Sequence, residues 1–116
     1  MLVSPSVEML GKLVKHQIHN LFFIDEYEAD AVLASLSAAL ENTEYCFSFS
    51  KNKYYKKNGC VFFSIYHSGQ YCIFLYFLAR QVISDFPALR DLADKIYFLN
   101  KALNGLDLYY EVVMPK

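Results

Sequence analysis

The sequence contains no tryptophan, only four glycines, three prolines and three cysteines. The glycines do not recur at a short fixed period, and no run of six-residue repeats is present, which argues against a repeat architecture. The cysteines, Cys46, Cys60 and Cys72, are odd in number and form no close pair, which argues against a disulfide framework and against a zinc knuckle. Each lies among apolar or aromatic residues, where a reduced thiol behaves as a small hydrophobic group.

An excess of charge of one sign is also missing. The chain has 11 Lys+Arg against 12 Asp+Glu, a net charge of -1, so it has no general attraction for nucleic acid or an anionic membrane. The longest apolar stretch, Tyr71 to Ala79, is much shorter than the about 20 residues that cross a bilayer. The residues from Met1 to Pro5 lack the basic and apolar regions of a signal peptide. We therefore expect a cytoplasmic protein with no nucleic-acid or membrane partner.

Aromatic residues are abundant. Hydrophobic residues make up 55% of the 116 residues, with 10 Phe and 10 Tyr among them. This length predicts a single domain, 1–116, that can bury a core without disulfides or metals. A domain of this size has too little interior for so many rings, so some are expected at an interface. The composition therefore favours a homo-oligomer.

Two amphipathic helices are predicted in the first third of the chain. The first begins at Ser4-Pro5-Ser6, because serine caps helices and proline suits a first turn. Its apolar face repeats at helical spacing through Val7, Leu10, Val14, Ile18 and Leu21. The second begins at the capping-box pair Asp25 and Glu28. Its apolar face contains Ala29, Val32, Leu36 and Leu40.

The middle of the chain indicates β-structure. Tyr45 to Ser50 alternates between phenylalanine and serine, and Cys60 to Tyr66 is rich in residues that favour strands. Between them lies a polar loop, Lys51 to Gly59, that ends in the turn dipeptide Asn58-Gly59. These features predict a small irregular hairpin.

Two further helices and a strand are predicted in the second half. A helix that begins near His67 and runs to about Ser84 is apolar nearly all round, which predicts a central, buried position. Pro87 opens a fourth helix, which ends at Asn104-Gly105. Its inward residues are expected to be Leu89, Leu92, Ala93, Ile96, Leu99 and Leu103. A strand over 106–113 follows. The predicted fold is mainly α, a small bundle of about four helices with a short β hairpin and a C-terminal strand.

Two groups of residues carry possible binding chemistry. His16 and His19 lie one helical turn apart and can share a metal ion, but no further ligand completes a site, so we expect solvent-facing histidines and no metal. The loop from Lys51 to Lys57 combines four lysines with Tyr54 and Tyr55, the residue types that hold single-stranded nucleic acid. The cluster is short and the whole chain is not basic, so a solvated loop is favoured.

The segment His67-Ser68-Gly69-Gln70-Tyr71 is the most site-like. It lies at a helix start, where backbone amides favour anions or polar ligands, and Gln70 projects near His67. Ser68 and His67 do not form a nucleophile and base, because adjacent side chains on a helix point apart and no acid orients the imidazole. A helix cap and a ligand contact both explain the segment. No residue is assigned a catalytic role.

Three segments together resemble the N-terminal part of serine-acetyltransferase-like proteins of the hexapeptide-repeat acyltransferase superfamily. They are His67 to Tyr71 with the aromatic helix that follows, Ala93 to Gly105, and Leu106 to Pro115. In that family a helical domain precedes a left-handed parallel β-helix, and the enzyme moves an acetyl group from acetyl-CoA to the hydroxyl of serine. The resemblance implies an oligomer-forming domain in cysteine biosynthesis, with His67 and Gln70 near the acceptor pocket.

The resemblance also implies where the chemistry takes place. In the family the catalytic Asp-His pair and the acetyl-CoA site belong to the β-helix, and this sequence contains no six-residue repeats. We therefore expect the chain to be inactive alone and to bind no cofactor by itself. Two alternatives remain open: a free-standing protein-interaction module, and a small binder of single-stranded nucleic acid that uses Lys51 to Lys57.

Overall fold

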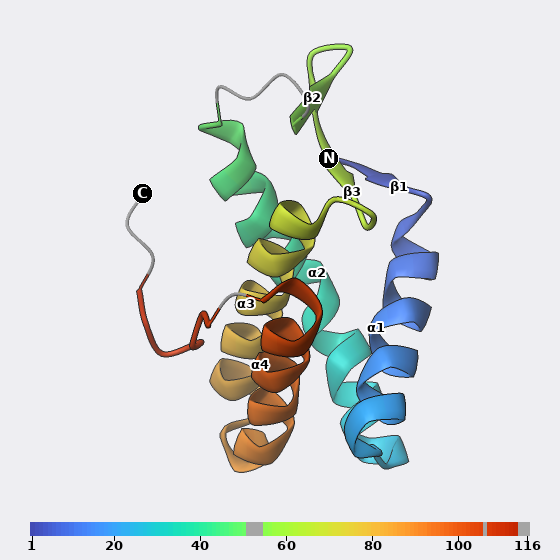
Figure 1. Cartoon of the computed structure of the whole chain (residues 1–116), viewed down its shortest axis with the longest axis vertical. Coiled ribbons are helices and arrows are strands. Elements are labelled where there is room, and N and C mark those ends of the chain that lie inside the picture. The colour runs from blue at the N-terminus through green and yellow to red at the C-terminus, as the bar shows by residue number, and fades with distance from the viewer. Residues whose placement is uncertain (51–54, 106, 114–116) are drawn as a thin grey trace.

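The computed structural model describes residues 1–50, 55–105 and 107–113. Over these ranges the chain forms four α-helices and a three-stranded sheet (Figure 1). The elements are β1 (Leu2–Ser4), α1 (Val7–Phe22), α2 (Glu26–Ser48), β2 (Lys56–Lys57), β3 (Cys60–Ser64), α3 (Ser68–Asp85), the 3-10 helix η2 (Pro87–Leu89) and α4 (Arg90–Asn104). The fold is therefore mainly α with a small sheet, which confirms the predicted class.

Local sequence signals account for the starts of the first two helices. The Ser6 side chain accepts a hydrogen bond from the Met9 amide at 3.1 Å and caps α1. Pro5 precedes this cap, so it does not lie in the first turn as predicted. At α2 the Glu28 amide donates to the Asp25 carboxylate at 2.7 Å, and the Asp25 amide donates to Glu28 at 3.3 Å. This reciprocal pair confirms the predicted capping box.

The predicted strand from Tyr45 to Ser50 is wrong, because α2 continues to Ser48. Ala39, Thr43 and Phe47 are buried at a spacing of one helical turn, which prolongs the inward face of the helix. Phe47 packs against Phe63 of β3, with ring centroids 5.9 Å apart. A two-residue alternation of phenylalanine and serine is too short to outweigh this burial.

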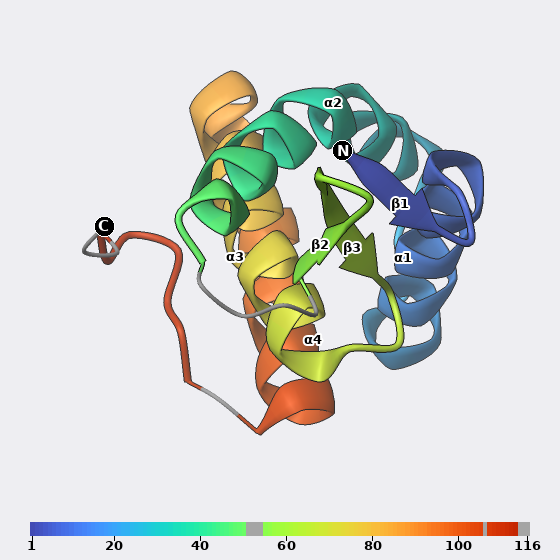
Figure 2. The ribbon, with the colours of Figure 1, turned by 90° about the horizontal axis from the view of Figure 1, so that it is seen from above.

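The hairpin forms instead between β2 and β3, which pair antiparallel around Asn58-Gly59. Both turn residues have positive φ, 54° and 80°, as a two-residue hairpin turn requires. Unexpectedly, β1 pairs parallel with β3, Leu2 opposite Phe62. Figures 1 and 2 show the sheet across one end of the helices, where β1 leads into α1 and β3 leads into α3.

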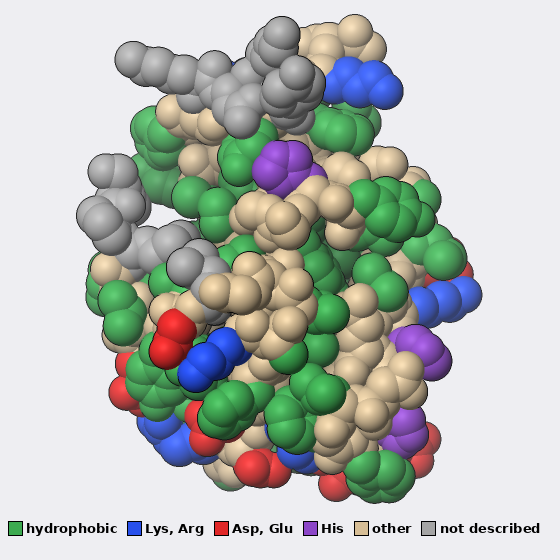
Figure 3. All heavy atoms as spheres, in the orientation of Figure 1, with side chains coloured by type: hydrophobic (Ala, Val, Ile, Leu, Met, Phe, Trp, Pro, Cys, Tyr) green, Lys and Arg blue, Asp and Glu red, His purple; other side chains and the backbone are tan. Residues whose placement is uncertain are grey.

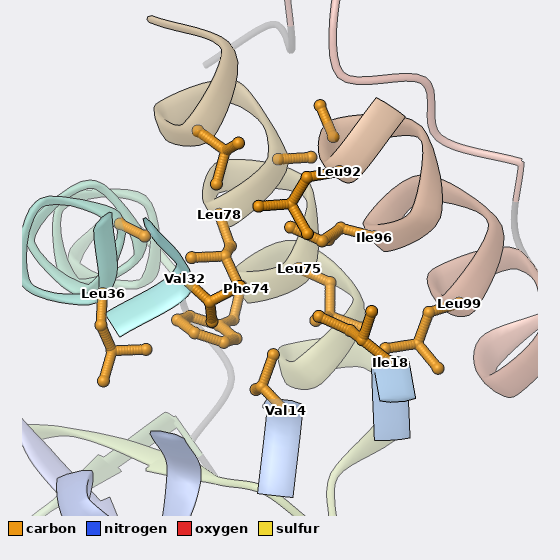
Figure 4. Packing of buried hydrophobic residues seen from close by; sticks show 14 of the residues in the cluster. Val14, Ile18, Val32, Leu36, Phe74, Leu75, Leu78, Leu92, Ile96 and Leu99 are labelled. Carbon is orange, nitrogen blue, oxygen red and sulfur yellow. The ribbon is translucent and has the colours of Figure 1, made fainter. Parts of the chain in front are cut away.

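Helix α3 is central, as predicted, and packs most extensively against α2 and α4. In Figure 4 aliphatic side chains from all four helices point toward one another around Phe74, Leu75 and Leu78 of α3. A buried hydrogen bond also links two helices of the core. The Asn100 side-chain amide of α4 donates to the Cys72 carbonyl of α3 at 3.0 Å.

Some apolar residues at helix ends are exposed rather than inward. Val7, Leu21 and Leu103 retain 46–48% of their exposure. Helical periodicity identifies the apolar face of a helix, but burial also requires a neighbouring element that covers that face.

The predicted C-terminal strand is also wrong for the residues described, 107–113, and Leu106 lies outside them. We call 107–113 the C-terminal segment. It packs on α3 and α4 through Tyr110, which is 1% exposed. The Tyr110 carbonyl accepts a hydrogen bond from Arg80 at 2.7 Å, and its hydroxyl donates to Asp94 at 2.6 Å. Residue types that favour strands therefore pack here against α3 and α4 instead of forming a strand. The segment lies on the side away from α1 (Figure 2).

Candidate functional site

The segment predicted to be most site-like links β3 to α3 through internal hydrogen bonds. His67 is the cap of α3: its Nδ1 accepts a hydrogen bond from the Gln70 amide at 3.2 Å. The Gln70 side chain is 1% exposed. Its Oε1 accepts from the Ser64 amide at 2.8 Å, and its Nε2 donates to the Phe62 carbonyl at 2.7 Å. The side-chain amide thus pairs with β3 as the peptide group of a neighbouring strand would.

This geometry explains the spacing of His67 and Gln70. One helical turn separates the cap from the residue that it caps, and the same residue bonds back to the preceding strand. The His67 ring also packs edge-on against Tyr55, with centroids 5.4 Å apart. A Cβ at Gly69 would lie 3.2 Å from the His67 ring, so glycine leaves room for it. The two residues are brought together as predicted, and their role toward an acceptor stays a prediction.

The histidines of α1 lie beside a shallow, open hollow between α1 and the start of α2. His16 Nε2 is 3.0 Å from the Asn20 amide nitrogen, and His19 Nδ1 accepts from the Ile24 amide at 3.4 Å. Within the described residues, no three histidine, cysteine or acidic side chains gather as metal ligands.

The basic loop is only partly described, since Lys51, Lys53 and Tyr54 lie outside the described residues. Lys56 and Lys57 are exposed on β2. Tyr55 packs between the Phe47 ring, 5.0 Å away, and His67. Its ring is thus engaged within the fold and offers less area for stacking on a base.

A pocket that the sequence analysis missed lies between the C-terminal half of α2 and α3. It has a volume of about 440 Å³ and reaches Val113 of the C-terminal segment. Its lining residues are Asn42, Tyr45, Cys46, Phe49, Tyr76, Phe77, Arg80, Gln81, Ser84 and Val113. We call it the α2–α3 pocket. Because its α2 wall was predicted to be a strand, the pattern could not reveal it.

Arg80 is the only charged residue that lines this pocket among those described. Its Nη1 donates to the Tyr110 carbonyl at 2.7 Å, and its guanidinium carbon lies 5.7 Å from the centroid of the Tyr76 ring. Tyr76 in turn donates to the Val112 carbonyl. Burial raises the pKa of the Cys46 thiol in the pocket wall, which favours its neutral form.

A second surface consists of aromatic rings at the end of α1, in the middle of α4 and in the C-terminal segment. Phe22 lies 6.2 Å from Phe98, which lies 5.1 Å from Tyr97, and Tyr97 lies 5.2 Å from Tyr109, all measured between centroids. We call these four residues the aromatic strip. Phe22 and Phe98 are 39% and 48% exposed. Figure 3 shows hydrophobic side chains exposed over α4, among acidic and basic ones.

Comparisons of the chain with protein-family models, curated proteins and solved structures give no match. In the described part of the chain, every helix is too short or too polar to cross a membrane.

Proposed function

We propose that this chain is the N-terminal helical domain of a serine-acetyltransferase-like enzyme. Its role is to join copies of the enzyme, while acetyl transfer from acetyl-CoA to a serine hydroxyl takes place outside the domain. The support begins with the three segments that resemble the family. They correspond to the start of α3, to α4, and to the C-terminal segment. These elements pack on one another, so the resemblance covers one physical unit rather than scattered residues.

The polar chemistry of the described residues supports a non-catalytic role. Acyl transfer requires a general base near the acceptor hydroxyl and usually a group that orients it. The hydrogen bonds of His16, His19 and His67 go to an asparagine side chain and to backbone amides. Gln70 uses both ends of its amide to hold β3. These side chains are engaged in the fold rather than arranged as an acid-base pair.

The aromatic strip is the observation that supports a role in joining copies of the chain. Its rings come from three separate parts of the chain, α1, α4 and the C-terminal segment, and Phe22 and Phe98 remain substantially exposed. Aromatic residues are enriched at the centres of protein interfaces, where their burial stabilises association. A second copy of the chain is the occupant implied by the family resemblance. Tyr110 is not part of this contact, because its side chain is only 1% exposed.

Sedimentation equilibrium of the purified chain tests this proposal. We expect a dimer or higher oligomer at ~100 µM, because contact residues of this kind each contribute about 1–2 kcal/mol or more. The double variant Phe22→Ser and Phe98→Ser is expected to be monomeric. Tyr66→Ser is the matched control, since Tyr66 is 83% exposed but lies next to β3. A monomeric wild-type chain at that concentration would contradict the proposal.

An assay for acetyl transfer from acetyl-CoA to serine complements the mass measurement. We expect no turnover above a control without protein. Turnover that is lost in His67→Ala would place a catalytic group in this domain and would refute the non-catalytic role.

A further inference from the structure

The α2–α3 pocket has the size and composition of a small-molecule site. Ligand pockets have volumes of about 300–1,000 Å³ and combine apolar walls with a few polar groups. This pocket, of about 440 Å³, lies in that range. Its walls contain the rings of Tyr45 and Phe49, which meet edge-on with centroids 5.0 Å apart. The polar groups are Asn42, Arg80, Gln81 and Ser84.

Arg80 makes this pocket electrostatically selective. A guanidinium carries five N–H donors, and in the described residues only one hydrogen bond from Arg80 is formed, to the neutral Tyr110 carbonyl. No carboxylate of the described residues lies within 4.0 Å of it, whereas Arg90 on α4 pairs with Glu111 at 2.7 Å. Among the described residues this partly buried cation has no counter-charge, which favours an anionic ligand.

The position of Arg80 is also set before any ligand arrives. The Tyr110 carbonyl holds one nitrogen, and the guanidinium lies over the Tyr76 ring. Asp85, five residues further along α3, accepts a hydrogen bond from Gln81 at 2.7 Å. A cation held in this way loses little conformational entropy on binding, which favours affinity.

We propose that the α2–α3 pocket binds a small organic carboxylate with an apolar body, such as an aryl carboxylate, whose carboxylate pairs with Arg80. Guanidinium and carboxylate groups match in geometry and form two parallel hydrogen bonds. The apolar body lies against Tyr45, Phe49 and Phe77. This site is separate from the aromatic strip, so the inference does not depend on the proposed function.

Isothermal titration calorimetry with naphthalene-2-carboxylate tests the site. We expect saturable binding of one molecule per chain. The neutral analogue naphthalen-2-ylmethanol is expected to bind at least about tenfold more weakly, because it lacks the charge-assisted hydrogen bonds. Arg80→Gln is expected to weaken binding of the carboxylate by a similar factor. Lys12→Gln is the matched control, since Lys12 is an exposed cation on α1 that pairs with Glu8 outside this pocket.

A second variant keeps the test decisive if Arg80→Gln does not fold. Ser84→Trp places a large ring into the pocket from an exposed position on α3, and it is expected to abolish binding while circular dichroism stays unchanged. Absence of saturable binding would overturn the proposal. So would equal affinity for the acid and the alcohol, or binding that survives Ser84→Trp in a folded protein.

Discussion

The two sides of α3 are built differently. Toward α4 the helix is closely packed: Leu92, Ala93, Ile96 and Leu99 are buried, and Asn100 bonds to the α3 backbone. Toward the C-terminal half of α2 the same helix leaves the α2–α3 pocket, lined by Phe77, Arg80 and Gln81. Close packing resists a change of even one methylene group, whereas a hollow tolerates it. One side of the helix therefore supplies stability, and the other offers space for a ligand.

Truncation of one fully buried side chain of α3 and of one side chain at the pocket should show the largest difference. Leu78 is fully buried, so Leu78→Ala is expected to lower the free energy of unfolding by about 2–5 kcal/mol through lost burial and a new cavity. Phe77 is half-buried and already borders the pocket, so Phe77→Ala is expected to cost no more than about half as much, despite the larger truncation. Urea denaturation measures both. Equal losses would mean that the pocket is closed in solution.

Two glutamines of α3 provide the next comparison. Gln70→Leu leaves the Ser64 amide and the Phe62 carbonyl without their side-chain partner, which is expected to lower the free energy of unfolding by about 2–4 kcal/mol, because each unsatisfied buried group costs about 1–3. Gln81→Leu is the matched control. It breaks only a surface hydrogen bond to Asp85, so a change within about 0.5 kcal/mol is expected.

Hydrogen exchange of the Ser64 amide localises the effect of Gln70→Leu. Faster exchange in this variant, with the amides of α4 unchanged, is expected if the side chain holds β3. Unchanged protection at Ser64 would contradict the role of the Gln70 side chain in holding β3.

The smallest effect concerns alkaline pH. Burial raises the pKa of Tyr71, and burial together with the hydrogen bond to Asp94 raises that of Tyr110. Because the unfolded tyrosines ionise near pH 10 and the folded ones only at higher pH, the folded state binds more protons above that pH. The contribution of these two hydroxyls to the free energy of unfolding is thus fully present below pH 10 and falls as the pH rises further.

The variants Tyr71→Phe and Tyr110→Phe are each expected to make the free energy of unfolding less steeply dependent on pH above 10. Tyr27→Phe is the control, because the Tyr27 ring is 63% exposed. Denaturation series at several pH values measure the slope. An equal slope in wild type and both variants would rule out these hydroxyls as its source.

Much of the fold was predictable because its signals are local. Ser6, the Asp25 and Glu28 pair, the Asn58-Gly59 turn and Gly105 act within one helical turn or one hairpin, so their positions can be read from neighbouring residues. The site was less predictable. His67 and Gln70 were recognised as a pair, but the sequence could not show that both ends of the Gln70 amide bind β3.

By itself, the sequence determined the helix starts, the hairpin turn and the central place of the apolar helix, because capping, turn chemistry and periodicity depend on nearby residues. Only the tertiary structure decided whether Tyr45 to Ser48 is helix or strand, and how the residues around Tyr110 are used. Both segments suit either conformation, and distant partners select one. Phe63 buries Phe47 on a continued helix, and Arg80 and Asp94 bind Tyr110 against α3 and α4.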